Sequence, residues 1–504
     1  MPLLYVKSWN QLESQMWRLL PSQDEKRLQK EQNRKDSNMK ILIKGAGDLA
    51  TGIASRLYGA GHQILMTEIE TPLTVRRTVA LSRAVYEKTA KVEGMEAFFA
   101  YLKEEAEHIL ERGDIAVMAD PEASCRGWYM PDVIIDAILA KENLGTAITD
   151  APFVIGVGPG FTAGEDCHCV IETKRGHTLG NIIWRGSAIP NTGVPGNVGG
   201  YTVERLIRAS ADGNVEPKVR IGDLVEKGQV VAVTGGQPVY AQMSGIVRGM
   251  LQSGVPVKAG LKIGDIDARA EVSHCYTISD KARAVGGGVL EATTGFERMS
   301  GRYAIVVLAA GAGTRFGGSK LHALVDGVPM YERMLQKVQV FSAFPAFVVT
   351  GDEKIADEAK KRSITPVWND RPEEGISLSL RLGLEAAVQS YRCEEPTPGT
   401  LERGLKGVFF SVCDQPWLTV STMQQIFRTA SLHPGSIVCA GRGGRGGNPV
   451  LWDCRYFSEL LELSGDVGGR QLMNKYRENV RIEEADEREL SDVDRQEDMR
   501  PVQV

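Results

Sequence analysis

Two stretches of the chain share one pattern, in which a short apolar run breaks into a glycine-rich turn and continues with helical periodicity. The first is KILIKGAGDLATG at residues 40–52, where Ile41–Ile43 predicts a strand and the helical pattern runs to Tyr58. The second runs from Ala304 to Lys320, AIVVLAAGAGTRFGGSK, and its β-branched start predicts a buried strand. Strand and helix patterns alternate after each turn, which indicates an α/β fold in both parts of the chain.

Between these two turns the pattern changes character once. Before the change, it predicts strands at Gln63–Met66, Ile115–Met118 and Phe153–Ile155, and helices at Met95–Glu111 and Val133–Lys141. Residues 216–272 then contain short β-rich segments with regular glycine turns, which predict a small barrel or sandwich. Residues 273–302 read as a helix that closes the first unit, followed by a linker.

The expected organisation therefore has five parts. Residues 1–38 form a polar extension, and Met39 is an alternative start because it directly precedes a strand. The others are a Rossmann-like domain at 39–215, the β module at 216–272, the closing helix and linker at 273–302, and a second α/β domain at 303–504. In this last domain the pattern predicts strands at Ala346–Val349 and Gly407–Val412 and helices at Met330–Val340 and Thr419–Thr429.

Composition narrows the class of protein. The 504 residues are 24% charged and 42% hydrophobic with a net charge of -5, so no general affinity for nucleic acid is expected. The sequence contains no apolar run of about 18 residues, so no membrane-spanning helix is expected. The eight cysteines are scattered through a long chain, which is typical of free thiols in a cytoplasmic protein.

The first glycine turn has the order of a nucleotide-binding unit. A turn between a strand and a helix points backbone N–H groups at an incoming anion, and an acid ending the second strand is where a dinucleotide fold binds ribose. Arg76 and Arg77 follow and can hold a phosphate. The ligand is either NAD(P) or another nucleotide, or the turn is the ordinary first turn of a doubly wound sheet. The candidate residues are Gly45, Gly47, Asp48, Gly52 and Glu68.

A Cys167-His168-Cys169 run invites a metal hypothesis, which the spacing opposes. In a strand the two cysteines share one face and the histidine points to the other, and no second ligand pair closes the site. The surrounding loop block, Gly156 to Gly196, is a better candidate for the lining of a small-ligand pocket.

The second glycine turn carries a different chemistry. It is neither a Walker A loop nor the GxGxxG fingerprint, yet its small residues let backbone N–H groups approach phosphates, and two basic residues can neutralise a triphosphate. A strand followed by LAAGxGxRxGGxK resembles the signature loop of nucleotidyltransferases that use NTPs. The candidate residues are Leu308, Ala309, Ala310, Gly311, Gly313, Arg315 and Lys320.

Further candidates follow at the ends of predicted elements. Ser377 and Ser379 precede a helix and offer donors to a nucleotide. Asp414 ends a buried strand, where it can hold Mg²⁺; the alternative is that it caps the next helix. Asn448 is a candidate second metal ligand or substrate ligand. The acceptor-binding candidates are Asn448, Asp466, Arg470 and Asp494.

These segments occur in the order LAAGAGTRFGGSK, EGISLSL, CDQP, GGNPVL, GDVGGRQL and SDVDRQEDM. Together they resemble the molybdenum cofactor cytidylyltransferases, whose guanylyl-transferring relatives typically carry LAGG in the first segment. The resemblance implies Mg²⁺-dependent transfer of CMP from CTP to a molybdopterin-type cofactor. A nucleotidyltransferase with another product, such as a sugar nucleotide, and a cofactor chaperone without turnover remain as alternatives.

Residues 39–298 resemble the accessory family of the selenium-dependent molybdenum hydroxylase system. The resemblance rests on KGAGDLATGIASRLYGAGHQILMTEIETPLTVRRTVA, GPGFTAGEDCHCVIETKRGHTLG and IGDIDARAE. It implies a role in maturation, with a molybdenum hydroxylase apoenzyme as recipient. The β module resembles a biotinyl/lipoyl barrel, but its Thr234–Tyr240 segment contains no carrier lysine, so a structural or docking role is expected.

Overall fold

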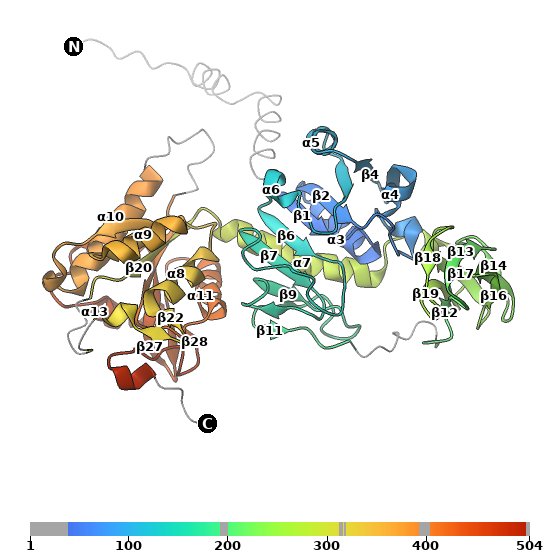
Figure 1. Ribbon diagram of the computed structural model, residues 1–504. Coiled ribbons are helices and arrows are strands. Elements are labelled where there is room, and N and C mark those ends of the chain that lie inside the picture. Colours follow the sequence, from blue (N-terminus) through green and yellow to red (C-terminus); the bar gives the residue numbers. More distant parts are fainter. Residues whose placement is uncertain (1–38, 192–199, 312–315, 317–318, 393–403, 500–504) are drawn as a thin grey trace, which may run out of the picture.

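The computed structural model describes residues 39–191, 200–311, 316, 319–392 and 404–499. The molecule has three structural units: a large sheet with its helices lies in the middle, a small β module lies on one side of it, and a second α/β unit lies on the other (Figure 1). The 1–38 extension, Gly313 and Arg315 lie outside the described residues. None of the described helices is long and apolar enough to cross a membrane.

The first unit is built on a nine-stranded sheet with the order β10-β9-β7-β6-β1-β2-β5-β4-β3. All neighbouring strands from β9 to β4 run parallel, and the two outer hairpin partners, β10 and β3, are antiparallel. Strand order reverses between β1 and β6, which creates a topological switch point. The elements are β1 (Lys40–Lys44), α3 (Asp48–Gly59), β2 (Gln63–Glu68), α4 (Arg83–Glu87), β3 (Thr89–Val92), β4 (Met95–Ala100), α5 (Lys103–Glu111), β5 (Ile115–Ala119), α6 (Arg126–Tyr129), β6 (Val133–Asp136), β7 (Phe153–Val157), β9 (Cys169–Ile171), β10 (Ile182–Ile183) and α7 (Asp280–Met299), with a small separate sheet of β8 (Thr162–Ala163) and β11 (Gly186–Ser187).

Two of the expected helices are wrong in this unit. Val133–Lys141 is the strand β6 followed by a loop, because all four strand residues are buried between β1 and β7 and show no polar face. Leu139 in that loop has a φ of +61°, which no helix continues through. Met95–Glu111 begins as strand β4, paired with β3 across a tight turn at Glu93 and Gly94, and only its second half is helical.

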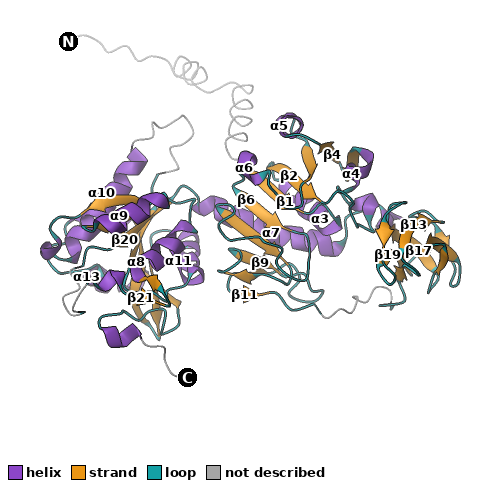
Figure 2. Cartoon of the chain, viewed as in Figure 1, coloured by secondary structure: helices purple, strands orange, loops and turns teal. Residues whose placement is uncertain are grey.

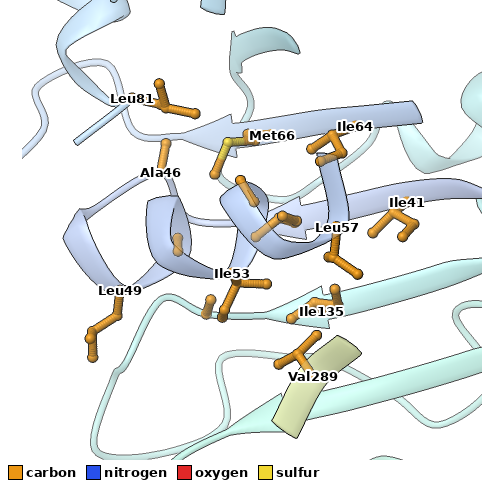
Figure 3. Close-up of a cluster of buried hydrophobic side chains, with 14 of the residues drawn as sticks. Ile41, Ala46, Leu49, Ile53, Leu57, Ile64, Met66, Leu81, Ile135 and Val289 are labelled. Atoms are coloured by element: carbon orange, nitrogen blue, oxygen red, sulfur yellow. The ribbon is translucent and has the colours of Figure 1, made fainter. Parts of the chain in front are cut away.

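Alternate residues of the central strands build two cores. Ile41, Ile43 and Ile135 face α3 and α7, whereas Leu42 and Ile134 face α5 and the loops on the other side. Figure 3 shows Ile53 and Leu57 of α3 among Ile41, Ile135 and Val289, the last of which belongs to α7. The closing helix therefore completes the core of the first unit, as expected from its sequence.

Glycines set the close approach of α3 and α7. A Cβ at Gly52 would lie 2.6 Å from the Cβ of Ala282, and one at Gly286 would lie 2.5 Å from the carbonyl oxygen of Gly52. Real Cβ atoms do not tolerate such contacts, so these two glycines hold the helices at a distance that no larger residue allows. Gly52, a ligand candidate from the sequence, is thus a packing residue.

The β module is a sandwich of two four-stranded sheets, with the orders β12-β19-β17-β14 and β16-β15-β13-β18. Its first strand begins at Leu206, ten residues before the expected boundary at 216. The Thr234–Tyr240 segment is the β15–β16 hairpin, which turns at Gly235 and Gly236, both at positive φ. The strands are β12 (Leu206–Arg208), β13 (Gly213–Pro217), β14 (Leu224–Val225), β15 (Val230–Thr234), β16 (Gln237–Tyr240), β17 (Gly245–Met250), β18 (Pro256–Val257) and β19 (Lys262–Asp267).

The last unit has a seven-stranded mixed sheet with the order β24-β23-β20-β25-β27-β26-β28. Strands β24, β23, β20 and β25 are parallel, and β27 is antiparallel to both of its neighbours. Figure 2 shows helices on both sides of this sheet. The elements are β20 (Tyr303–Leu308), β21 (Leu324–Val325), β22 (Val328–Pro329), α8 (Met330–Gln339), β23 (Ala346–Thr350), α9 (Glu353–Lys361), β24 (Thr365–Trp368), α10 (Ile376–Arg392), β25 (Gly407–Val412), α11 (Val420–Leu432), β26 (Ile437–Arg442), β27 (Arg445–Asp453), α12 (Phe457–Leu461), α13 (Arg470–Lys475) and β28 (Val480–Glu484). The α/β class expected for both parts of the chain is confirmed.

The two α/β units pack against each other through a buried histidine. His168 Nδ1 accepts from the Val154 N–H at 2.9 Å, so in the neutral ring Nε2 carries the proton and donates to the Val340 carbonyl at 3.4 Å. Burial lowers the pKa of His168 to about 4. Cys167 and Cys169 are buried thiols, and within the described ranges no cluster of metal-ligating side chains is present, so the Cys-His-Cys run is a packing feature.

The His168 contact predicts an acid-sensitive interface. Its pKa falls from 6.5 to about 4 on folding, so the unfolded chain binds a proton below pH 6.5 that the folded chain does not bind until about pH 4. Stability is therefore lost as the pH falls through this window, by about 3 kcal/mol from this group. Urea unfolding at pH 7 and pH 4.5 measures the loss, and His168→Asn, which keeps an acceptor for Val154, reduces it. An equal loss in both proteins would contradict this account.

Candidate functional site

A cavity of about 530 Å³ opens at the carboxyl ends of the parallel strands of the last unit. Five of the six sequence segments singled out above contribute lining residues; GGNPVL does not. Because parallel strands present their carboxyl ends at one edge, residues that are far apart in the sequence meet here. Among those lining it are Leu308, Ala310, Gly311, Lys320, Gly375, Ser379, Asp414, Asp466 and Asp494.

Lys320 lies at the centre of the polar wall of this cavity. Its Nζ donates to Asp414 Oδ2 at 2.9 Å and to Asp494 Oδ1 at 2.8 Å. Burial opposes the charge of this ammonium, but the two carboxylates outweigh it and raise the pKa of Lys320 above its ordinary value. The arrangement places the Lys320 ammonium between the side chains of Asp414 and Asp494.

Backbone pairing brings the two carboxylates together. The Val493 N–H donates to the Asp414 carbonyl at 2.9 Å, and the Gln415 side chain donates to Asp492 at 3.0 Å. Val493 is fully buried, which fixes the segment that carries Asp494. Burial and the nearby Asp414 charge raise the pKa of Asp492. Asp414 does not cap the next helix, because the Thr419 side chain accepts from the Thr422 N–H and takes that role.

The segment before α10 is held close to the loop that carries Asp466. Gly375 has a φ of +90°, and a Cβ there would lie 2.6 Å from the Gly465 carbonyl carbon. Ser377 donates its hydroxyl to the Gly465 carbonyl at 2.7 Å, so it positions this loop and does not face the cavity. Ser379 accepts from Asn369 at 3.0 Å and lines the cavity, which leaves its own proton available to a ligand.

Two acceptor candidates lie elsewhere. Asn448 is an exposed residue of β27, and Arg470 is the exposed first residue of α13; neither lines the cavity. Ala309 is buried and donates its N–H to the Val349 carbonyl. It therefore fixes the start of the loop and does not line the cavity. The carboxylate that accompanies Asp414 is therefore Asp494, where the sequence pointed to Asn448.

At the glycine turn of the first unit, the candidate polar side chains already have partners within the protein. Gly45 has a φ of +92°, and a Cβ there would lie 3.0 Å from the Ala137 carbonyl oxygen. Glu68 accepts from the Ala46 N–H at 3.1 Å and from Ile69, and burial raises its pKa. Gly47 precedes α3, and Asp48 pairs with Arg76 at 3.2 Å and does not cap the helix. The carboxylate expected to bind a ribose is thus bound to the turn itself.

The last unit, which contains this cavity, is similar in sequence to a known domain family. Residues 305–480 match the MobA-like NTP transferase domain. This part of the chain is therefore a nucleotidyltransferase-like domain.

One curated relative is similar over a long stretch. It is the uncharacterized protein YqeB of Escherichia coli (strain K12), which is 51% identical over 252 residues, 50% of this chain and 47% of the relative. The chain thus spans about half the length of that relative.

Solved structures with a similar fold include a nucleotidyl transferase from Methanothermobacter (22% identity, 39% of this chain and 94% of that one, TM-score 0.32). Others are molybdopterin-guanine dinucleotide biosynthesis protein A from Archaeoglobus fulgidus (15%, 39% and 94%, TM-score 0.28) and a manganese complex of Rv0371C from Mycobacterium tuberculosis H37Rv (21%, 36% and 88%, TM-score 0.27).

Proposed function

We propose that residues 303–504 transfer CMP from CTP to the terminal phosphate of a molybdopterin-type cofactor and release pyrophosphate. The observation that carries the proposal is the Lys320–Asp414–Asp494 cluster on the wall of a cavity next to the glycine turn after β20. The matched domain supports nucleotidyl transfer as the reaction. The ordered motifs of the sequence support CTP and the molybdopterin-type cofactor as the substrates.

We assign separate roles in nucleotidyl transfer to residues that line the cavity. Backbone N–H groups of Ala310 and Gly311 approach the phosphates, and Lys320 neutralises negative charge that develops on the departing pyrophosphate. A phosphate nucleophile carries its own charge, so positioning it in line with the α-phosphorus is the main task of the protein. Asp466, which also lines the cavity, is the residue we assign to the acceptor.

The donor set also fits a divalent cation. Asp414 and Asp494 both reach the same ammonium nitrogen, so their oxygens lie close enough to share an ion. Mg²⁺ is commonly held by one or two carboxylates together with substrate phosphates. Asp414 and Asp494 would hold the ion, which would offset the negative charge of a triphosphate.

We propose that residues 39–298 serve the same pathway as an accessory unit for maturing a selenium-dependent molybdenum hydroxylase, with the apoenzyme as recipient. The support is the long sequence resemblance of this part. The contact of His168 with the Val340 carbonyl holds the first unit against the last unit.

The test is pyrophosphate release by the full chain with Mg²⁺, the molybdenum-bound pterin and either CTP or GTP. We expect release with CTP that depends on the pterin, because the Ala309-Ala310 pair favours CTP, and at least tenfold slower release with GTP. Faster release with GTP would overturn the nucleotide assignment. Tight cofactor binding without any release would favour the chaperone alternative.

A further inference from the structure

A second cavity, of about 510 Å³, lies where the first unit meets the β module and the start of α7. Its walls include Asp48 and Leu49 after β1, Leu139 and Ala140 after β6, Pro159 after β7, and Thr173 to Arg175 after β9. These are the carboxyl ends of the strands on either side of the β1/β6 reversal, the position at which open α/β sheets bind ligands.

The lining of this cavity is strongly basic. Seven arginine and lysine side chains contribute to it, against the carboxylates of Asp48 and Asp265. They come from three parts of the chain: Arg76, Lys174 and Arg175 from the first unit, Arg205, Arg248 and Lys262 from the β module, and Lys281 from α7.

Four of these cations pair with the carboxylates of Asp48, Asp265 and Asp280. Arg76 pairs with Asp48 at 3.2 Å, and Arg175 makes a bidentate pair with Asp280 at 2.7 and 3.0 Å. Arg205 and Lys262 share Asp265, at 2.6 and 3.6 Å. These pairs hold the walls in place, and of the remaining cations Arg248 forms an ion pair with Asp267 at 3.6 Å.

Arg248 is the most unusual of the remaining cations. It is 7% exposed, its Nε has no hydrogen-bond partner, and its nearest carboxylate, Asp267 at 3.6 Å, is already held by Arg269 at 2.6 and 2.9 Å. Burial, and then the charge of Arg76, lower its pKa. A buried guanidinium without good partners is costly unless something else binds it.

Two lysines on the cavity wall, the half-buried Lys281 and the exposed Lys174, also lack partners among the described residues. In the part of the chain that the structure describes, the Lys281 and Lys174 ammonium groups make no ion pair or hydrogen bond, although both line the cavity. Burial, followed by the nearby Arg175, lowers the pKa of Lys281. The Nε atoms of Arg76 and Arg205 are also buried and unpartnered.

We infer that this cavity is a binding site for an anion with two linked phosphate groups, clamped between the first unit and the β module. The β module then supplies one wall of a ligand site, which gives it a role without a carrier lysine. The site differs from a dinucleotide site, because Glu68 is bound to the Ala46 N–H and does not line the cavity. The inference is independent of the reaction proposed for residues 303–504.

Calorimetric titration tests this assignment on the full chain. Lys320→Gln serves as the background, because it removes the cation of the other cavity and so reduces diphosphate binding there. The probes are inorganic pyrophosphate and CDP, which share the diphosphate and differ in the nucleoside. We expect binding of both, and the tighter of the two identifies whether the nucleoside is part of the ligand.

Charge-removing variants in that background locate the site. We expect Arg248→Gln and Lys281→Gln each to weaken pyrophosphate binding at least tenfold. Lys227→Gln, an exposed lysine of the β module away from the cavity, changes it less than twofold. Lys281 is only half-buried, so its variant should fold even if Arg248→Gln does not. Absence of binding to the Lys320→Gln protein, or equal affinities in Lys281→Gln and Lys227→Gln, would overturn the inference.

Discussion

Replacing Asp414 with asparagine should reduce pyrophosphate release by a factor on the order of a hundred while leaving the fold intact. Removing one group that stabilises a transition state electrostatically costs about 3 kcal/mol. Asp414 holds Lys320 and faces the cavity, and its side chain caps no helix, so the loss should appear in turnover and not in stability. Initial rates at saturating CTP, together with a thermal unfolding curve, measure both quantities.

The matched control is Asp357→Asn. Asp357 is an exposed carboxylate of α9 that pairs with Lys360 on the surface, so the same charge is removed away from the cavity. Its rate should stay within twofold of the unchanged protein. If Asp414→Asn also keeps near-full activity with an unaltered requirement for Mg²⁺, Asp414 has no part in the reaction.

The second large effect should come from the glycine triplet of α7. Gly286→Ala places a methyl group 2.5 Å from the Gly52 carbonyl oxygen, where α3 and α7 are in contact. Overpacking of this kind costs about 1–3 kcal/mol. The first unfolding transition of the full chain, followed in urea by circular dichroism, should therefore shift to a lower denaturant concentration.

Gly287→Ala provides the neighbouring comparison. A Cβ at Gly287 meets no atom within 4 Å, so the substitution adds only helix propensity and should stabilise by about 0.5–1 kcal/mol. Coincident unfolding curves for the two variants would mean that the close contact of α3 with α7 does not limit the stability of this unit.

The sequence predicted correctly the elements whose boundaries are set by residues close together in the chain. The strands β1 and β20 and the start of α11 have clear boundaries in the sequence, because glycine turns and helix caps act over a few residues. The pattern at Val133–Lys141 misled because a strand covered on both faces loses its alternation. At Met95–Glu111, a strand and a helix follow each other with only two residues between them, and the pattern merged them.

For the candidate site, too, the sequence predicted only the features that neighbouring residues determine. Lys320 stands out in the sequence because it ends the glycine-rich motif, and Asp414 because it follows a buried strand; the structure brings them together at 2.9 Å. The partnership of Asp494 with them depends on the pairing of Val493 with Asp414, a contact over about 80 residues that no local pattern encodes. The basic cavity was missed for a similar reason, since Arg248 and Lys281 acquire their meaning only when the β module and α7 meet the sheet.

The most direct test of the central proposal is the mass of the product. The full chain is incubated with Mg²⁺, the molybdenum-bound pterin cofactor and an equimolar mixture of the four ribonucleoside triphosphates, and the pterin fraction is analysed by mass spectrometry. We expect the mass of one CMP added to the cofactor, with loss of this product in Asp414→Asn. A guanylyl adduct as the main product would contradict the choice of nucleotide, and an unmodified cofactor would contradict the transfer reaction itself.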